Sequence, residues 1–145
     1  MQPHERIEGF QQVIDRFGCW PSFHDGEVHR VVLDRTTLSA SGASVPSLEL
    51  HLRGWTLGSE VTAEGFYQRH DDTVVHFLFE DVFDCALEGF NHQNVLFSLK
   101  LSETTDDRGP VLHVELEHCY GLSGTLSARG ARILRVVPYV LGRAC

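Results

Sequence analysis

The sequence predicts an α+β fold in which an N-terminal amphipathic helix packs on a curved, mainly antiparallel meander sheet of about seven strands. Apolar residues recur at helical spacing near the N-terminus, and later segments alternate apolar and polar residues with turn-forming residues between them. The chain has no internal repeat and no linker-like segment. We therefore expect one domain over residues 1–145.

The helix is expected over residues 4–17. Pro3 lies near its start, and Gly18 suits the left-handed position that ends many helices. After the helix, Trp20 and Phe23 are expected to anchor the core where helix meets sheet. The apolar stripe of the helix consists of Ile7, Phe10, Val13, Ile14 and Phe17.

The strands are expected where apolar residues alternate or run together. The hairpin of the segments 95–101 and 112–116 is well marked, because Asp106 to Pro110 between them supplies turn chemistry. A continuous apolar run at 74–79, carrying His76, is typical of a central strand. The expected strands are residues 28–33, 48–52, 74–79, 95–101, 112–116, 124–128 and 131–137.

Three connections complete the expected fold. Residues 36–47 are rich in Ser, Thr, Ala and Gly, which indicates a loop or a frayed hairpin tip. Residues 54–73 have no steady period and predict a long exposed connection. Arg129-Gly130 predicts a tight turn between the last two strands, and the last strand is expected at an edge of the sheet.

Composition and motifs exclude several classes of function. A formal net charge of −8 argues against binding to nucleic acid or to anionic membranes. There is no P-loop, no dinucleotide-binding GxGxxG, no GxSxG elbow and no HExxH motif, so we expect no enzyme activity and no cofactor. No export signal or long apolar run is present, which favours the cytoplasm. The four cysteines form no CxxC pair and are expected as free thiols: Cys19, Cys85, Cys119 and Cys145.

Charge is distributed unevenly along the chain. From Glu60 to Glu88 there are eight acids and one base, Arg69, whereas the segment after Cys119 holds four arginines and no acid. Such asymmetry can steer a basic partner toward one side of a molecule, although a merely solubilising face gives the same pattern. The candidates for partner contact are Glu60, Glu64, Asp71, Asp72 and Asp84.

A second pattern allows metal or acid–base chemistry. If a strand begins by Asp25, alternation places Asp25, Glu27 and His29 on one face, which suits a divalent metal or a small hydrolase. The alternative is structural, because His24 and Asp25 can satisfy backbone groups where the chain enters a strand. His51, His76 and His113 also fall in expected strands and could converge.

Two short segments together resemble the bacterial immunity protein 50 family. They are Trp20-Pro21-Ser22-Phe23-His24-Asp25-Gly26-Glu27-Val28 and Gly89-Phe90-Asn91-His92-Gln93-Asn94-Val95. The likeness extends over residues 74–82 and 87–99 and the late strands to Pro138, whereas residues 36–72 match no pattern of the family. The signature residues are Trp20, Phe23, His24, Asp25, Glu27, Phe90, Asn91 and Asn94.

The resemblance implies a small cytoplasmic protein that binds and neutralises a polymorphic toxin made by the same cell, with no cofactor and no reaction of its own. An acidic inhibitor suits a toxin with a basic cleft, as nucleases have. Reversing Asp71 and Asp72 to lysine is then expected to slow association and leave the melting temperature nearly unchanged. Asn91 and Asn94 suit a turn, and we expect their side chains to bond across to His24 and Asp25.

Overall fold

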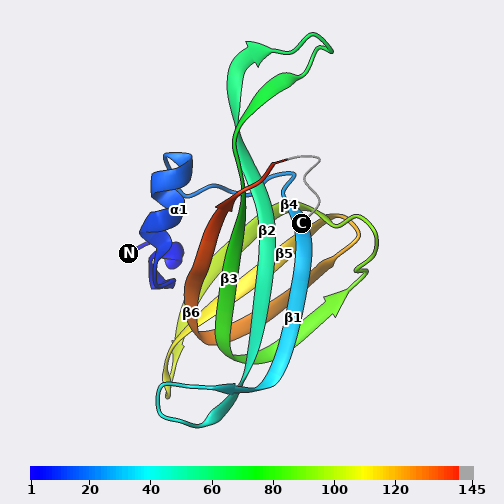
Figure 1. Cartoon of the computed structure of the whole chain (residues 1–145). Helices are drawn as coiled ribbons and strands as arrows, with labels where there is room; N and C mark the ends of the chain where they lie inside the picture. Colours follow the sequence, from blue (N-terminus) through cyan, green and yellow to red (C-terminus); the bar gives the residue numbers. More distant parts are fainter. Residues whose placement is uncertain (141–145) are drawn as a thin grey trace.

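A computed structural model describes residues 1–140 and has one helix on six antiparallel strands that close into a barrel (Figure 1). The order around the barrel is β1-β2-β3-β6-β5-β4. The predicted α+β class is confirmed, with one strand fewer than expected. The elements are a 3-10 turn at Pro3–Arg6, α1 at Phe10–Phe17, β1 at Glu27–Leu38, β2 at Ser44–Val61, β3 at Tyr67–Glu88, β4 at Val95–Asp106, β5 at Gly109–Tyr120 and β6 at Ser123–Pro138.

The barrel consists of two three-stranded meanders, β1-β2-β3 and β4-β5-β6. One seam between them is long: β3 pairs with β6 from Thr73 opposite Pro138 to Glu88 opposite Ser123. The other seam is short, because β1 and β4 share the single register pair of Glu27 and Val95. The predicted meander is therefore correct within each half. Between the halves it is not followed, because the long seam joins β3 to β6 and not to β4.

The N-terminal helix is shorter than the expected span of residues 4–17. Between the 3-10 turn and α1, Glu8 forms a short parallel bridge with Arg132 of β6. The Glu8 N–H donates to the Ala131 carbonyl at 2.9 Å, and the Ile133 N–H donates to the Glu8 carbonyl at 2.8 Å. The ladder between β5 and β6 ends at Ala128, so β6 has a free edge here that draws the chain out of helical geometry. As expected, Gly18 ends α1 in a left-handed conformation.

The sequence predicted an irregular connection over residues 54–73. In the structure, most of these residues lie in strand. The ends of β2 and β3 extend past the barrel as a two-stranded ribbon that projects into solvent (Figure 1). We call residues 55–72 the finger. The alternation that marks a strand comes from one buried face, and the finger packs neither face on the core, so its sequence carries no such period.

The predicted turn at Arg129-Gly130 is also wrong. Both residues lie inside the continuous strand β6, where Gly130 pairs with Glu80 and adopts no positive φ. β6 lies between β3 and β5 only as far as Ala128; beyond it the strand pairs with β3 alone, apart from the bridge at Glu8, so the end of β6 lies on an edge as expected. Of the two interpretations of residues 36–47, the hairpin tip is correct: β1 continues to Leu38, β2 begins at Ser44, and the two pair up to that point.

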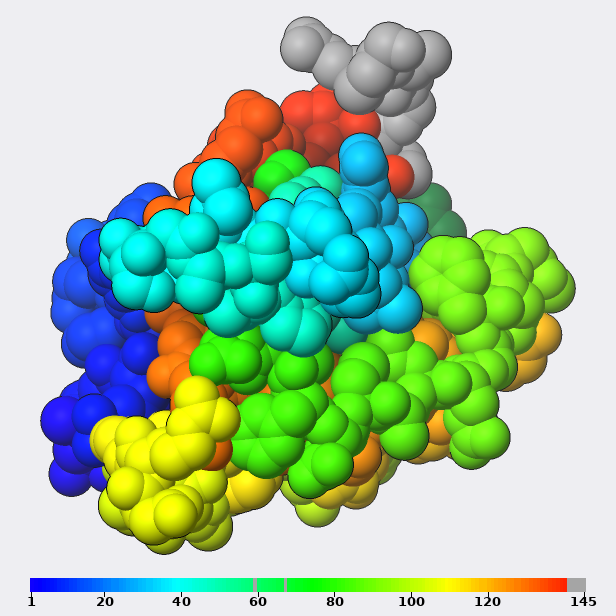
Figure 2. Space-filling view, turned by 90° about the horizontal axis from the view of Figure 1, so that it is seen from below, coloured from blue at the N-terminus to red at the C-terminus, as the bar shows by residue number. Residues whose placement is uncertain are grey.

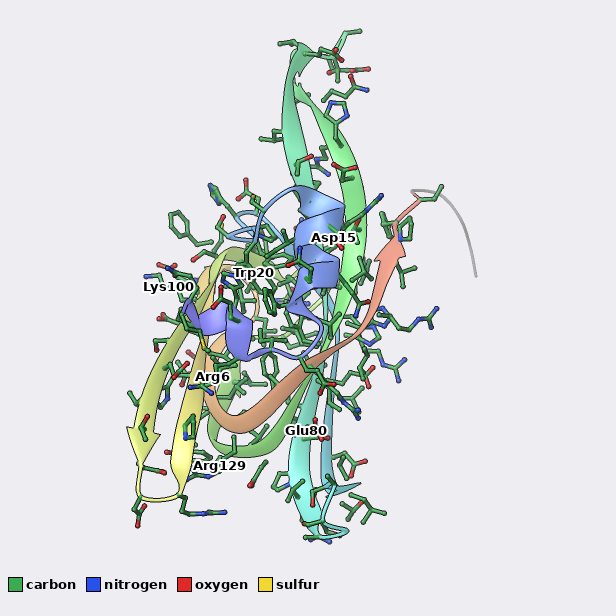
Figure 3. All side chains as sticks on the ribbon, turned by 90° about the vertical axis from the view of Figure 1, so that its left-hand side faces the viewer. Arg6, Asp15, Trp20, Glu80, Lys100 and Arg129 are labelled. Carbon is green, nitrogen blue, oxygen red and sulfur yellow. The ribbon has the colours of Figure 1, made fainter. Side chains whose placement is uncertain are left out.

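The N-terminal segment and the barrel share one hydrophobic core. Phe77 on β3 is fully buried and meets the rings of Trp20 and Phe23 edge-on, at centroid distances of 6.2 and 5.9 Å. Trp20 lies between the N-terminal segment and the barrel wall (Figure 3). Trp20 and Phe23 thus anchor the core as expected. Other fully buried core side chains are Ile7, Val13, Leu48, Leu50, Leu52, Val75 and Phe79.

Several acids of β3 have a backbone role that their charge does not suggest. Asp71, Asp81 and Asp84 have positive φ values of 55°, 54° and 51°. Asp71 and Asp84 lie where the pairing register of β3 shifts, toward β2 and toward β6 respectively. Aspartate tolerates this left-handed conformation better than most residues, because its short side chain bonds locally. Part of the acidic excess therefore follows from bends in a 22-residue strand.

Asp84 provides a test of this backbone role. We expect Asp84→Ala to lower the free energy of unfolding by about 1 kcal/mol, because alanine adopts positive φ at greater cost. Asp84→Gly removes the same carboxylate but accepts the conformation, so it should be at least as stable as the original chain. Urea denaturation of the three proteins measures the difference. Equal losses for alanine and glycine would show that the carboxylate, and not the backbone, matters.

Candidate partner-binding surface

The two signature segments lie side by side and close the barrel through main-chain hydrogen bonds. The Asp25 N–H donates to the Leu96 carbonyl at 3.0 Å, and the Leu96 N–H returns a bond to the Gly26 carbonyl at 2.8 Å. The Val28 N–H donates to the Asn94 carbonyl at 2.8 Å, and the Leu99 N–H to the Ser22 carbonyl at 2.9 Å. These bonds connect β1 and its entry segment to β4, where the two strands share only one register pair.

The first signature adopts a bent backbone that needs its particular residues. Phe23 and Asp25 have positive φ values of 58° and 61°. A Cβ atom on Gly26 would lie 2.9 Å from the carbonyl oxygens of Phe23 and Arg53. Only glycine allows this approach, and the Gly26 N–H uses it to donate to the Phe23 carbonyl at 2.9 Å.

Asn94 organises the second signature from a buried position. Its side-chain oxygen accepts hydrogen bonds from the backbone N–H groups of Asn91 at 2.9 Å and Leu122 at 3.1 Å. Its amide donates to the Asn91 carbonyl at 2.8 Å, and the residue is only 3% exposed. Asn94 therefore holds the loop before β4 against the turn before β6.

The expected side-chain bonding between the two signatures does not occur. The oxygen of Asn91 accepts from the Gln93 N–H at 3.0 Å, within its own loop. His24 faces the Phe97 carbonyl through Nδ1 at 3.1 Å, and Asp25 lies 3.4 Å from the same ring nitrogen. The prediction that the two segments meet was right, but the main chain connects them instead of Asn91 and Asn94 reaching His24 and Asp25.

The three groups proposed for metal or acid–base chemistry do not converge. β1 begins at Glu27, and Asp25 precedes it with positive φ, so the alternation that would align Asp25 with Glu27 and His29 does not reach it. Glu27 and His29 face each other at 3.2 Å, while Asp25 lies beside His24. Over residues 1–140 we find no group of three or more His, Cys, Asp and Glu side chains arranged to hold a metal ion.

Two of the three strand histidines meet on the outer surface of the barrel. The rings of His51 and His76 stack at a centroid distance of 3.6 Å, and His51 also contacts the carboxylate of Glu49. Burial, with a further contribution from His51, lowers the pKa of His76. His113 lies elsewhere and bridges the hydroxyls of Thr104 and Ser127.

The finger is the most prominent exposed feature and carries both apolar and acidic side chains. Leu57 and Val61 are each 60% exposed, and Phe66 is 72% exposed. Glu60 and Glu64 lie exposed among them, near the turn in which the Thr62 N–H donates to the Phe66 carbonyl. The apolar residues were missed in the sequence because the segment was interpreted as an irregular connection. Large exposed apolar side chains beside acids are typical of a protein-binding surface.

The base of the finger is fastened to the barrel by charged and aromatic contacts. Arg53 donates two hydrogen bonds to the carboxylate of Asp72, at 2.9 and 2.7 Å, and this pairing raises the pKa of Arg53. The same guanidinium lies over the Tyr139 ring at 4.0 Å. From α1, Arg16 donates to the hydroxyl of Thr73 at 2.7 Å. Within the finger, Arg69 packs over the Trp55 ring at 4.0 Å.

The five acidic candidates divide into three groups. Glu60 and Glu64 are exposed near the tip, with no ion pair in the described part of the chain. Asp71 and Asp72 lie at the base, where Asp72 pairs with Arg53 and Asp71 lies 3.9 Å from Arg16. Asp84 lies near the other end of β3, beside a groove of about 520 Å³. The acids thus form no single face.

This arrangement changes one expectation from the sequence. Reversing Asp72 to lysine would place two cations together at the base of the finger, because Arg53 is 13% exposed and bonded to that carboxylate. An unchanged melting temperature is therefore not expected for the Asp71 and Asp72 pair. Within the finger, Glu60 and Glu64 are the acids whose charge can be changed without breaking an ion pair described in residues 1–140.

Cys19, Cys85 and Cys119 are free and exposed, while Cys145 lies outside the described residues. Among residues 1–140, neither helical segment has the length and apolar character needed to span a bilayer.

Comparison with known proteins identifies one relationship. The model of the family Imm50, described as Immunity protein 50, matches residues 9–139. This range contains both signature segments and the finger. Searches of curated proteins and of solved structures gave no match.

Asn94 tests whether the signatures serve the fold. We expect Asn94→Ala to lower the free energy of unfolding by about 1–3 kcal/mol, since it leaves backbone N–H groups of Asn91 and Leu122 without an acceptor. The neighbouring exposed residue provides the matched control, and Gln93→Ala should stay within about 0.5 kcal/mol of the original chain. Thermal and urea denaturation measure both. Equal stability of the two variants would refute a structural role for Asn94.

Proposed function

Because the chain belongs to the immunity protein 50 family, we propose that it binds a toxin domain made by the same bacterial cell and neutralises it in the cytoplasm. Inhibition occurs by occupation of the toxin surface, without a reaction by this protein and without a cofactor. The family relationship supports the role of an immunity protein. The identity of the contact surface is a separate step, which rests on the finger.

The finger is the observation that carries this proposal. It extends beyond the barrel, so it can enter a concave site that the barrel itself is too wide to reach (Figure 1). Leu57, Val61 and Phe66 offer apolar area for burial in a partner. Glu60 and Glu64 add negative charge among them, and the finger contains no lysine.

Charge complementarity favours a toxin with a basic cleft. Enzymes that act on nucleic acid hold phosphate groups with lysine and arginine, and an acidic finger occupies such a cleft in place of the substrate. Attraction between opposite charges also speeds encounter, which suits a protein that must capture its toxin before damage occurs. The net charge of −8 contributes to the same attraction at longer range.

The contacts at the base of the finger lower the cost of binding. A flexible loop loses conformational entropy when a partner orders it, whereas a finger already held by Arg53, Asp72 and Arg16 loses less. We therefore assign Asp72 a positioning role and assign direct contact with the toxin to Glu60 and Glu64.

The neutralising role is tested by growth. Expression of the toxin domain encoded beside this chain should arrest growth, and co-expression of this protein should restore it. Purified toxin and immunity protein should form a one-to-one complex by native mass spectrometry. Continued arrest, although this protein is folded and present in excess, would argue against the proposal.

The role of the finger is tested by charge reversal. We expect the double variant Glu60→Lys with Glu64→Lys to slow association with the toxin by about tenfold or more and to weaken its salt dependence, with the melting temperature nearly unchanged. The control is Asp107→Lys with Glu115→Lys, two exposed acids outside the finger. Each substitution adds two charges, so both double variants have a formal net charge of −8 + 4 = −4. Stopped-flow association that slows equally in both would show that only total charge matters.

A further inference from the structure

One edge of β1 has no partner strand in the described residues. β1 pairs with β2 along most of its length, but its ladder with β4 consists of the single pair of Glu27 and Val95. The last hydrogen bond from β1 toward β4 is donated by the Val28 N–H. Residues 30–34 therefore present unpaired backbone groups, which can template a further strand.

These five residues form the regular part of the strand. The register of β1 against β2 shifts between Val28 and Arg30 and again between Asp34 and Thr37. Between the two shifts, residues 30–34 pair one by one with residues 51–47 of β2. A strand that joins this edge is thus limited to a short, well-defined register.

The sequence of this stretch, Arg30-Val31-Val32-Leu33-Asp34, is complementary to itself. In an antiparallel pair centred on Val32, Arg30 lies opposite Asp34 of a second copy, and Val31 lies opposite Leu33. Opposite charges and apolar residues that face each other across strands both stabilise the pairing. The two-fold symmetry of such a pair makes each contact twice.

The charged residues of the stretch are available for these contacts. Neither Arg30 nor Asp34 takes part in an ion pair within residues 1–140. One carboxylate oxygen of Asp34 accepts from the backbone N–H and hydroxyl of Thr36, at 2.7 and 2.9 Å. Asp34 is an exposed residue, so a partner can reach its carboxylate. The bonds from Thr36 also lower the pKa of Asp34.

An apolar groove borders the same edge. It has a volume of about 370 Å³ and lies between β1 and the end of β3 with the residues that follow it. These segments adjoin in the end-on view of Figure 2. Leu33 is 64% exposed and Phe90 is 56% exposed at its rim. Val31 and Leu33, two residues apart, both line the groove and therefore share a face of β1. The remaining lining residues are Leu87, Glu88, Gly89 and Leu122.

We propose that this edge is a dimer interface, at which residues 30–34 of β1 pair antiparallel with the same residues of a second copy. Arg30 and Asp34 fix the register, and Val31 and Leu33 of each copy cover the apolar grooves. The pairing occupies the free β1 edge of each of the two copies. Assembly therefore stops at two copies and forms no fibre. The interface uses no residue of the finger and does not depend on the toxin-binding proposal.

Complementary charge variants test the interface. Sedimentation equilibrium of the full chain should give twice the monomer mass of 16.3 kDa. Arg30→Asp places two acids opposite each other at both contacts, and Asp34→Arg places two arginines there. Each variant alone should weaken dimerisation by about tenfold or more. A mixture of the two variants restores both opposite-charge contacts and should form a heterodimer.

The control and the contrary outcomes are equally specific. Arg35→Asp makes the same charge change just outside the regular stretch and should dimerise like the original chain. Circular dichroism of each variant confirms folding, which matters for Asp34→Arg because it loses the Thr36 bonds. A monomeric original chain at several hundred micromolar would overturn the proposal, as would a dimer insensitive to both variants. Loss of toxin binding by Arg30→Asp, with a monomeric original chain, would assign the edge to the toxin instead.

Discussion

The fold depends on one short seam where the entry to β1 bonds to the start of β4. Elsewhere the barrel is held by ladders of many residues, but here four main-chain hydrogen bonds connect residues 22–28 to residues 94–99. The bent backbone of Phe23 and Asp25 and the close approach at Gly26 make these bonds possible. His24 and Asp25 bear chemically active groups, but they lie where the backbone must bend to form these bonds.

This constraint explains why the two signature segments can be recognised without a reaction to account for them. A strained entry requires glycine at one position and short polar residues at others, and a buried asparagine is needed to satisfy three backbone groups around it. The aromatic residues Trp20 and Phe23 then close the core against Phe77. Both signatures thus have a structural role in this chain, and the surface that we propose for binding lies outside them.

The acidic residues also divide into two groups: those that have a structural role and those that are free to contact a partner. Asp71, Asp81 and Asp84 adopt positive φ, and Asp72 is bonded to Arg53. Glu80 lies 3.4 Å from Arg132, and Asp81 lies 3.9 Å from Arg108. What distinguishes Glu60 and Glu64 is their place among exposed apolar residues on the finger. Net charge alone does not identify a binding surface when backbone geometry and ion pairs account for many of its acids.

Sequence reasoning was reliable where one face of an element is buried. The hairpin of β4 and β5, the buried run in β3 and the end of α1 at Gly18 were all predicted from local patterns. The finger was missed because neither of its faces packs on the core, and Arg129-Gly130 resembles a turn although pairing with β3 holds it extended. The closing seam and the bridge at Glu8 depend on contacts between distant residues, which no local pattern encodes.

For the candidate site, local patterns found the acids but not their roles. Glu60 and Glu64 were identified as candidates, yet the pairing of Asp72 with Arg53 joins residues 19 positions apart and was not evident. The alternation that grouped Asp25 with Glu27 and His29 failed because the strand begins two residues later than assumed. A single left-handed residue is enough to break such a pattern.

The central claim is that the signature segments hold the fold together while the finger contacts the toxin. Amide hydrogen exchange of the protein, alone and with the toxin, tests this claim most directly. The account predicts that toxin binding slows exchange in residues 55–72 and leaves residues 22–28 and 91–99 nearly unchanged, since the latter are already protected by the barrel seam. Slower exchange confined to the signature segments, with no change in the finger, would contradict it.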